Sequence, residues 1–239
     1  MIARAEDPVA AERQALRASL ERTQLYSEEL GVDLSEGTDR QLFRWFLASL
    51  LFGGRITETI AKNTYRAFAR HRLLAPREIV AAGWDFLVNP IMREGGYVRY
   101  DGRKSTQILQ DCEKLLRDYR GSLRRLREEA ADPADLDRRL TDFYGVGPVT
   151  ANIFLRELRP YWAKADPAPL PSVREAAKKL GIDLGAYRRK SVVFTRVEAG
   201  LIRRRRELAA LRARGAPRRT SGAPSRGAAS SRASPGAAC

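Results

Sequence analysis

The residues best suited to chemistry lie in the segment 140–158, where two amphipathic helices are joined by a short turn with the sequence YGVGP. Gly145 and Gly147 permit a tight turn without side chains over the backbone, and Pro148 suits the first turn of a helix, where its missing N–H costs nothing. The free N–H groups at the positive end of that helix attract anions. The spacing therefore predicts a phosphate-binding turn.

The charge balance of the chain points to an anionic partner. Of its 239 residues, 44 are Lys or Arg and 29 are Asp or Glu, which gives a formal net charge of +15. Such an excess favours a polyanion, and nucleic acid is the first candidate. Hydrophobic residues make up 44% of the chain and charged residues 31%, so a buried core is expected and a wholly disordered or fibrous protein is excluded.

Apolar residues recur with a helical period and strand-like alternation is nearly absent, so we expect an all-α fold. The most apolar segment, 39–52, follows a potential cap at Thr38 and should lie at the centre of a domain, because apolar side chains cover most of its circumference. Gly53 and Gly54 should end this helix in the left-handed conformation that glycine tolerates. The other predicted helices span residues 9–30, 56–70, 76–82, 84–93, 122–130, 133–143, 149–158, 171–180 and 185–213. A further predicted helix follows the loop GGYVRYDGRKS, has Ile108, Cys112, Leu115 and Tyr119 on its inner face and runs up to Gly121.

Cysteine and histidine are too few for several kinds of site. The two cysteines, Cys112 and Cys239, are far apart, and the chain has one histidine, His71. One chain can therefore form neither a disulfide framework nor a four-thiolate or histidine-rich metal site, and a Ser-His-Asp triad would have to use His71. We expect His71 at the surface or at a helix end and Cys112 in the core, and we predict no metal and no cofactor.

The two ends of the chain bear on its surroundings. The N-terminus is charged from the start, and no apolar run approaches the roughly 20 residues of a membrane span, so we expect a soluble, cytoplasmic protein without a membrane partner, and a monomer. Residues 214–239 are nearly all Gly, Ala, Pro, Ser and Arg and should be disordered. This basic tail is either a non-specific arm for nucleic acid or a tolerated compositional feature.

The hairpin motif GVGxxTA over residues 145–151 resembles the helix-hairpin-helix of the endonuclease III-like DNA glycosylases, the HhH-GPD superfamily. The helix ending in LASLLFGG, with the helix that follows it to Phe68, resembles the early helix pair of that family. The glycine-aromatic loop before Lys104 resembles the family's loop that leads to a Lys. Together these similarities cover about residues 40–200 in the family's order.

The resemblance implies a DNA repair enzyme that rotates a damaged or mispaired base out of double-stranded DNA and cuts the bond between base and sugar. It implies two lobes with a cleft between them, a helical barrel over residues 35–130 and a second lobe made of residues 1–34 and 131–213. In that family the hairpin holds the DNA backbone by main-chain amides. The implied DNA-binding residues are Gly145, Val146, Gly147, Val149 and Thr150 of the hairpin, with Arg55, Arg103 and Lys104 as further contacts.

The resemblance also implies a catalytic Asp after the second hairpin helix, whose carboxylate would stabilise the positive charge that develops on the sugar. Asp166 lies at a suitable distance from the hairpin, whereas an alignment on the following helix places Leu170 at that position. Family members that also nick the strand have a Lys where this chain has Val149, so lyase activity by that route is not expected. The cysteines for the iron-sulfur cluster of many relatives are missing too.

Three functions stay open at this point. The first is a monofunctional glycosylase with Asp166 as its catalytic carboxylate. The second is a non-catalytic DNA-binding protein that has kept the hairpin. The third is a helical protein-interaction domain with a basic tail, which unchanged DNA affinity in Gly147→Lys would favour.

Overall fold

The computed structural model describes residues 8–215, and every regular element in that range is helical. The all-α prediction is confirmed. The elements in chain order are α1 (Pro8–Glu21), α2 (Tyr26–Glu29), α3 (Asp39–Phe52), α4 (Glu58–Arg70), α5 (Pro76–Phe86), the π-helical turn η1 (Leu87–Met92), α6 (Arg93–Gly95), α7 (Asp101–Tyr119), α8 (Leu123–Glu129), α9 (Pro133–Thr141), α10 (Pro148–Leu158), α11 (Pro171–Leu180), the 3₁₀ turn η2 (Leu184–Ala186) and α12 (Val192–Gly215).

Helix α3 lies at the centre of the larger buried core, as its apolar composition predicts. Nine of its residues from Leu42 to Leu51 are buried, and the helix packs against α4, α8 and α10. Its N-terminus is capped by the Thr38 hydroxyl, which accepts the N–H of Gln41 at 3.3 Å. The indole Nε1 of the fully buried Trp45 donates to the Phe154 carbonyl at 3.1 Å, so a polar bond also ties α3 to α10.

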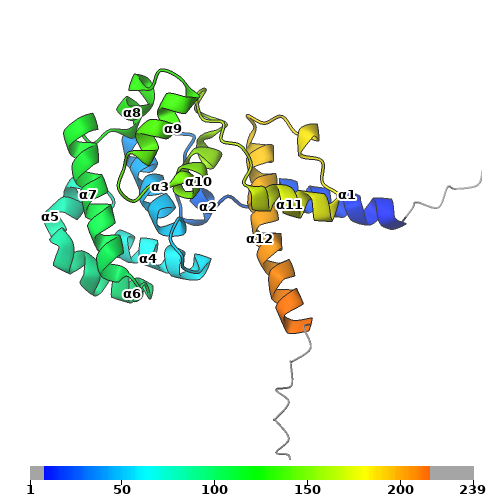
Figure 1. Ribbon diagram of the computed structural model, residues 1–239, viewed down its shortest axis with the longest axis horizontal. Helices are drawn as coiled ribbons and strands as arrows, with labels where there is room; N and C mark the ends of the chain where they lie inside the picture. Colours follow the sequence, from blue (N-terminus) through cyan, green and yellow to red (C-terminus); the bar gives the residue numbers. More distant parts are fainter. Residues whose placement is uncertain (1–7, 216–239) are drawn as a thin grey trace, which may run out of the picture.

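The helices form two groups (Figure 1). The larger group contains α2 to α10 around one buried core, and the smaller group contains α1, α11, η2 and α12 around a second, smaller core. The grouping differs from the predicted lobes, because the hairpin helices α9 and α10 pack into the larger core with α3 to α8. The predicted tail falls almost wholly on residues outside the described range.

The predicted helix over 9–30 is wrong in its middle, because α1 ends at Glu21 and α2 begins at Tyr26. The break lies where the chain passes from the smaller core to the larger one. The carboxylate of the buried Glu157 accepts the N–H groups of Tyr26 and Ser27 at 3.1 and 2.9 Å. A side chain 130 residues away thus starts a new helix, which local periodicity does not reveal.

The reason given above for the end of α3 is also wrong. Gly53 has φ −69°, an ordinary right-handed value, and Gly54 is not among the glycines with positive φ. Close packing requires these glycines instead, because a Cβ on Gly53 would collide with the side chain of Thr150, and one on Gly54 would lie 2.8 Å from the hydroxyl of Tyr97. The end of α3 is therefore pressed directly against the start of α10.

Candidate nucleic-acid interface

The hairpin consists of α9, a turn over residues 142–147, and α10. Phe143 and Val146 point their side chains into the core, and the Val146 N–H donates to the Phe143 carbonyl at 3.1 Å, which closes the turn. Gly147 caps α10 with its backbone, and Gly147 and Val149 are exposed. The N–H groups of Gly147, Val149 and Thr150 have no acceptor within the described part of the chain. These unpaired donors at a helix N-terminus form an anion cradle.

A buried carboxylate on α7 anchors the turn from the core side. Asp111 of α7 is fully buried, and both of its oxygens lie 3.3 Å from the N–H of Gly145, which donates to them. Burial raises the pKa of Asp111 to about 7, while hydrogen bonds from the backbone of the turn and the charges of Lys104 and Lys114 act in the opposite direction. The Gly145 amide therefore serves the fold and is not available to a ligand.

The two glycines of the turn have different roles. A Cβ on Gly145 would lie 2.7 Å from a carboxylate oxygen of Asp111 and 3.3 Å from the Cβ of Gln107. A Cβ on Gly147 would have no atom within 4 Å, and its φ of −89° suits any residue. Gly145 is thus required by packing, whereas Gly147 leaves open the space over the amides where an anion would bind.

The predicted phosphate contacts separate into two kinds. Arg55, in the loop between α3 and α4, and Arg103, in the first turn of α7, are exposed. Lys104 differs from them, because its side chain is buried and its amine donates to the Leu50 carbonyl at 3.1 Å. Burial lowers the pKa of Lys104 to about 8, an effect that the charge of Asp111 partly opposes. In this structure the Lys104 amine therefore supports the interior, and a phosphate contact by Lys104 stays a prediction.

The exposed arginines border the anion cradle. Gly53, two residues before Arg55, packs on Thr150 of α10, and Arg103 lies one helical turn before Gln107, which packs beside Gly145. Tyr144, at the tip of the turn, is 62% exposed. We call this surface the hairpin face; it comprises Arg55, Arg103, Tyr144, Gly147, Val149 and the amide of Thr150.

Asp166 is held by arginines. Its carboxylate accepts hydrogen bonds from Arg189, the shortest 2.7 Å between Nη2 and Oδ1, and lies 3.0 Å from Nε of Arg159. Arg159 is itself buried and also pairs with Glu198 of α12. Burial acts to raise the pKa of Asp166, but the hydrogen bond and charge of Arg189 and the charge of Arg159 outweigh it and leave the pKa lowered. Asp166 is therefore an ion-paired carboxylate that joins the loop after α10 to the segment before α12.

A groove of about 400 Å³ runs between α10 and the start of α11, next to the hairpin face. We call it the apolar groove; it is lined by Tyr26, Phe52, Val149, Ile153, Arg156, Leu170, Pro171, Ser172 and Ile202. The structure thus brings Val149 together with Leu170, the alternative candidate position, and Asp166 is not among the lining residues. None of these described lining residues carries a carboxylate.

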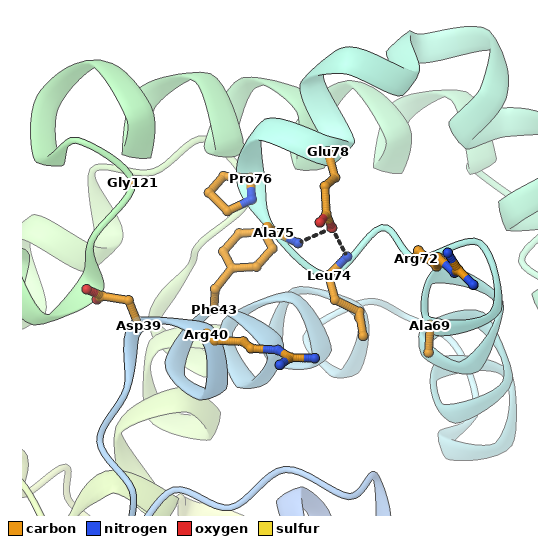
Figure 2. Close-up of a pocket in the computed structure, with 10 residues that line it drawn as sticks. All are labelled: Asp39, Arg40, Phe43, Ala69, Arg72, Leu74, Ala75, Pro76, Glu78 and Gly121. Atoms are coloured by element: carbon orange, nitrogen blue, oxygen red, sulfur yellow. Dashed lines mark hydrogen bonds between the residues drawn. The ribbon is translucent and has the colours of Figure 1, made fainter.

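A second pocket, of about 670 Å³, lies at the opposite end of α3 (Figure 2). Asp39 and Arg40 border it from the first turn of α3, and Arg72 follows α4. The carboxylate of Glu78 accepts the N–H groups of Leu74 and Ala75 and so caps α5 rather than facing a ligand. This pocket contains none of the residues that the sequence singles out for chemistry.

The described residues show two further features. No group of three or more His, Cys, Asp or Glu in that range could hold a metal ion, and no helix there is long and apolar enough to cross a membrane. His71 ends α4, where its Nε2 lies 2.9 Å from Glu94. Comparison of the chain with protein-family models, with curated proteins and with solved structures finds no match.

Proposed function

We propose that this protein binds duplex DNA through the hairpin face and holds the DNA backbone by the main-chain amides of Gly147, Val149 and Thr150. The observation that carries this proposal is the anion cradle at the exposed Gly147 and Val149 and the buried Thr150, whose three N–H groups are unpaired within residues 8–215. Arg55 and Arg103 border it and carry no acid partner among the described residues. The anions that repeat along the backbone of DNA are phosphates, and amides and arginines are the groups that contact them in proteins.

The geometry supports binding without base excision better than it supports a glycosylase. Hydrolysis of a glycosidic bond needs a carboxylate next to the sugar. In this chain the groove beside the cradle presents Val149 and Leu170, and Asp166 is engaged by two arginines. We therefore favour the non-catalytic hypothesis, in which the chain has kept the DNA-binding hairpin and has no carboxylate placed for hydrolysis of the glycosidic bond.

Base excision by Asp166 is the second candidate, and one observation favours it. The carboxylate of Asp166 is 31% exposed and its pKa is lowered, so it is ionised at neutral pH and within reach of water. A substrate that displaced Arg189 from Asp166 would contact the ionised carboxylate of Asp166. This route requires a rearrangement of the loop after α10.

Two assays distinguish these functions. Fluorescence anisotropy with a labelled duplex at several salt concentrations should show binding that weakens as salt rises. Gly147→Leu should weaken that binding about tenfold, the effect of one lost hydrogen bond to a charged group, while the melting temperature is unchanged because a Cβ at Gly147 meets open space. Unchanged affinity in Gly147→Leu would refute the role of the cradle.

The second assay measures base release. Duplexes that each carry one lesion or mismatch are incubated with the protein and then treated with hot alkali, which breaks the strand at abasic sites. We expect binding and no breaks. Alkali-dependent breaks that appear with the unchanged protein and disappear with Asp166→Asn would instead establish the glycosylase.

A further inference from the structure

The pocket of about 670 Å³ at the far end of α3 lies where several helices begin or end (Figure 2). Its lining residues come from the first turn of α3, the end of α4, the loop into α5 and the glycine shortly after α7. Phe43, Leu74 and Pro76 give the pocket apolar walls. Apolar concave surfaces of this size are the places where ligands and anchoring side chains bind.

Three exposed arginines surround this pocket. Arg40 and Arg72 line it, and Arg120 directly precedes its lining residue Gly121. The side chains of all three form no ion pair and no hydrogen bond within the part of the chain that the structure describes. Three guanidinium groups at the rim of an apolar pocket are therefore open to the acids of another molecule.

The two acidic residues of the pocket are held by the fold. The carboxylate of Asp39 accepts the Ser122 hydroxyl at 2.9 Å and the Arg124 N–H at 3.0 Å. In Figure 2 that carboxylate lies at the end of the pocket away from Arg72. Glu78 caps the first turn of α5 by accepting two main-chain N–H groups. Neither acid pairs with an arginine of the rim, so an occupant has to bring its own negative charge.

Each of the three arginines stands where another residue type would be more stable. Arg72 and Arg120 have φ of 60° and 54°, the left-handed conformation that glycine adopts with less strain at helix ends. Arg40 is in the first turn of α3, where the helix dipole disfavours a cation. Local preferences are broken mainly at functional sites. Three such exceptions around one pocket indicate that these charges serve an interaction rather than the stability of the fold.

We propose that this pocket is the docking site of an acidic protein segment, which places one large apolar side chain against Phe43 and Leu74. The carboxylates of the segment pair with Arg40, Arg72 and Arg120. Charge complementarity selects such a partner, and the apolar anchor supplies most of the affinity. Nucleic acid fits this pocket less well, because its phosphates gain nothing from apolar walls.

The docking site is separate from the hairpin face and does not depend on DNA binding. Helix α3 has 14 residues and is therefore about 21 Å long. The hairpin packs on the end of α3 at Gly53, whereas the pocket is bordered by Asp39 and Arg40 at its start. DNA and an acidic partner can thus be bound at the same time.

The probe for this site is a fluorescein-labelled peptide in which one tryptophan is flanked on each side by three glutamates. Anisotropy titrations with the full-length protein should show binding that weakens as salt rises. Replacement of the glutamates by glutamine should weaken the binding at least tenfold, and replacement of the tryptophan by alanine should weaken it about tenfold.

Variants then place the peptide in this pocket. Arg72→Gly removes a guanidinium and relieves the left-handed strain, so it should weaken peptide binding about tenfold without lowering the melting temperature. Ala69→Trp fills the pocket from a half-buried position and leaves the arginines in place, and it should weaken binding as much. Arg174→Ala, at an exposed arginine of α11 in the smaller group, is the matched control and should keep the affinity.

The outcomes decide this proposal independently of the hairpin. Absence of peptide binding, or equal affinity for the glutamate and glutamine peptides, overturns the docking site. Unchanged affinity in Arg72→Gly and Ala69→Trp also overturns it. A saturating unlabelled duplex should leave the peptide bound, and displacement by the duplex would instead identify the peptide's site as a nucleic-acid surface. A protein that binds the peptide but no duplex refutes the hairpin proposal alone.

Discussion

Replacement of Asp111 by Asn tests the buried anchor of the hairpin turn. The carboxylate of Asp111 is fully buried and accepts the Gly145 N–H, and burial raises its pKa from 3.8 to about 7. Asn has nearly the same shape and keeps a carbonyl oxygen for that N–H, but it cannot ionise. The variant therefore removes the charge while it preserves the contact.

The expected effect follows from the two pKa values. Between pH 4 and pH 7 the unfolded chain has released the proton of Asp111 while the folded chain still binds it, so the free energy of unfolding falls as pH rises through this range. A difference of about 3 pKa units corresponds to about 4 kcal/mol when the full range is crossed. Other carboxylates contribute to the pH dependence of the protein, but they contribute equally to the variant.

Urea denaturation followed by the fluorescence of the tryptophans, including the buried Trp45, measures this difference. The free energy of unfolding of Asp111→Asn minus that of the unchanged protein should increase by about 4 kcal/mol from pH 4 to pH 8. DNA affinity at pH 7 should be unchanged, because the turn keeps its anchor. A difference that is independent of pH, or that decreases as pH rises, would refute the raised pKa and show that the nearby Lys104 stabilises the ionised carboxylate.

Three further predictions concern the same surface and its supports. Gly145→Ala should lower the melting temperature because its Cβ would lie 2.7 Å from the anchoring carboxylate, whereas Gly147→Ala, whose Cβ meets open space, should leave the melting temperature unchanged. Arg55→Ala and Arg103→Ala should each reduce the slope of log affinity against log salt by about 0.9 in anisotropy titrations, and a variant at a distant exposed arginine should not. Asp166→Asn should lower the free energy of unfolding by about 2 kcal/mol in urea denaturation, because it removes one of the two carboxylates that pair with the buried guanidinium of Arg159.

Much of the fold is predictable because apolar residues that recur with the helical period mark the buried face of each helix. The apolar side chains of 39–52 surround that segment, and the structure places it as the central helix α3. The periodicity of apolar residues gives no sign of the break between α1 and α2. It depends on Glu157, which is brought to the N-terminus of α2 only by the tertiary fold.

The site was predictable in part. The motif around Gly147 indicates an exposed turn before a helix, and the structure has one, but Lys104, predicted as a phosphate contact, is buried. The spacing of Lys104, Ile108 and Asp111 places all three on one buried face of α7, so periodicity contained a signal that their charges obscured. No local pattern reveals the arginine partners of Asp166, because Arg189 lies 23 residues away.

The anchoring of the turn bears on the proposed binding of a DNA backbone by a surface with few side chains. Asp111 holds Gly145 from α7, Thr150 packs on Gly53 at the end of α3, and Phe143 and Val146 are buried in the core. The amides of the cradle are thus fixed before a ligand arrives, so binding does not have to order them. Main-chain donors are the same for every base sequence, so the proposed clamp would position DNA without selecting a sequence.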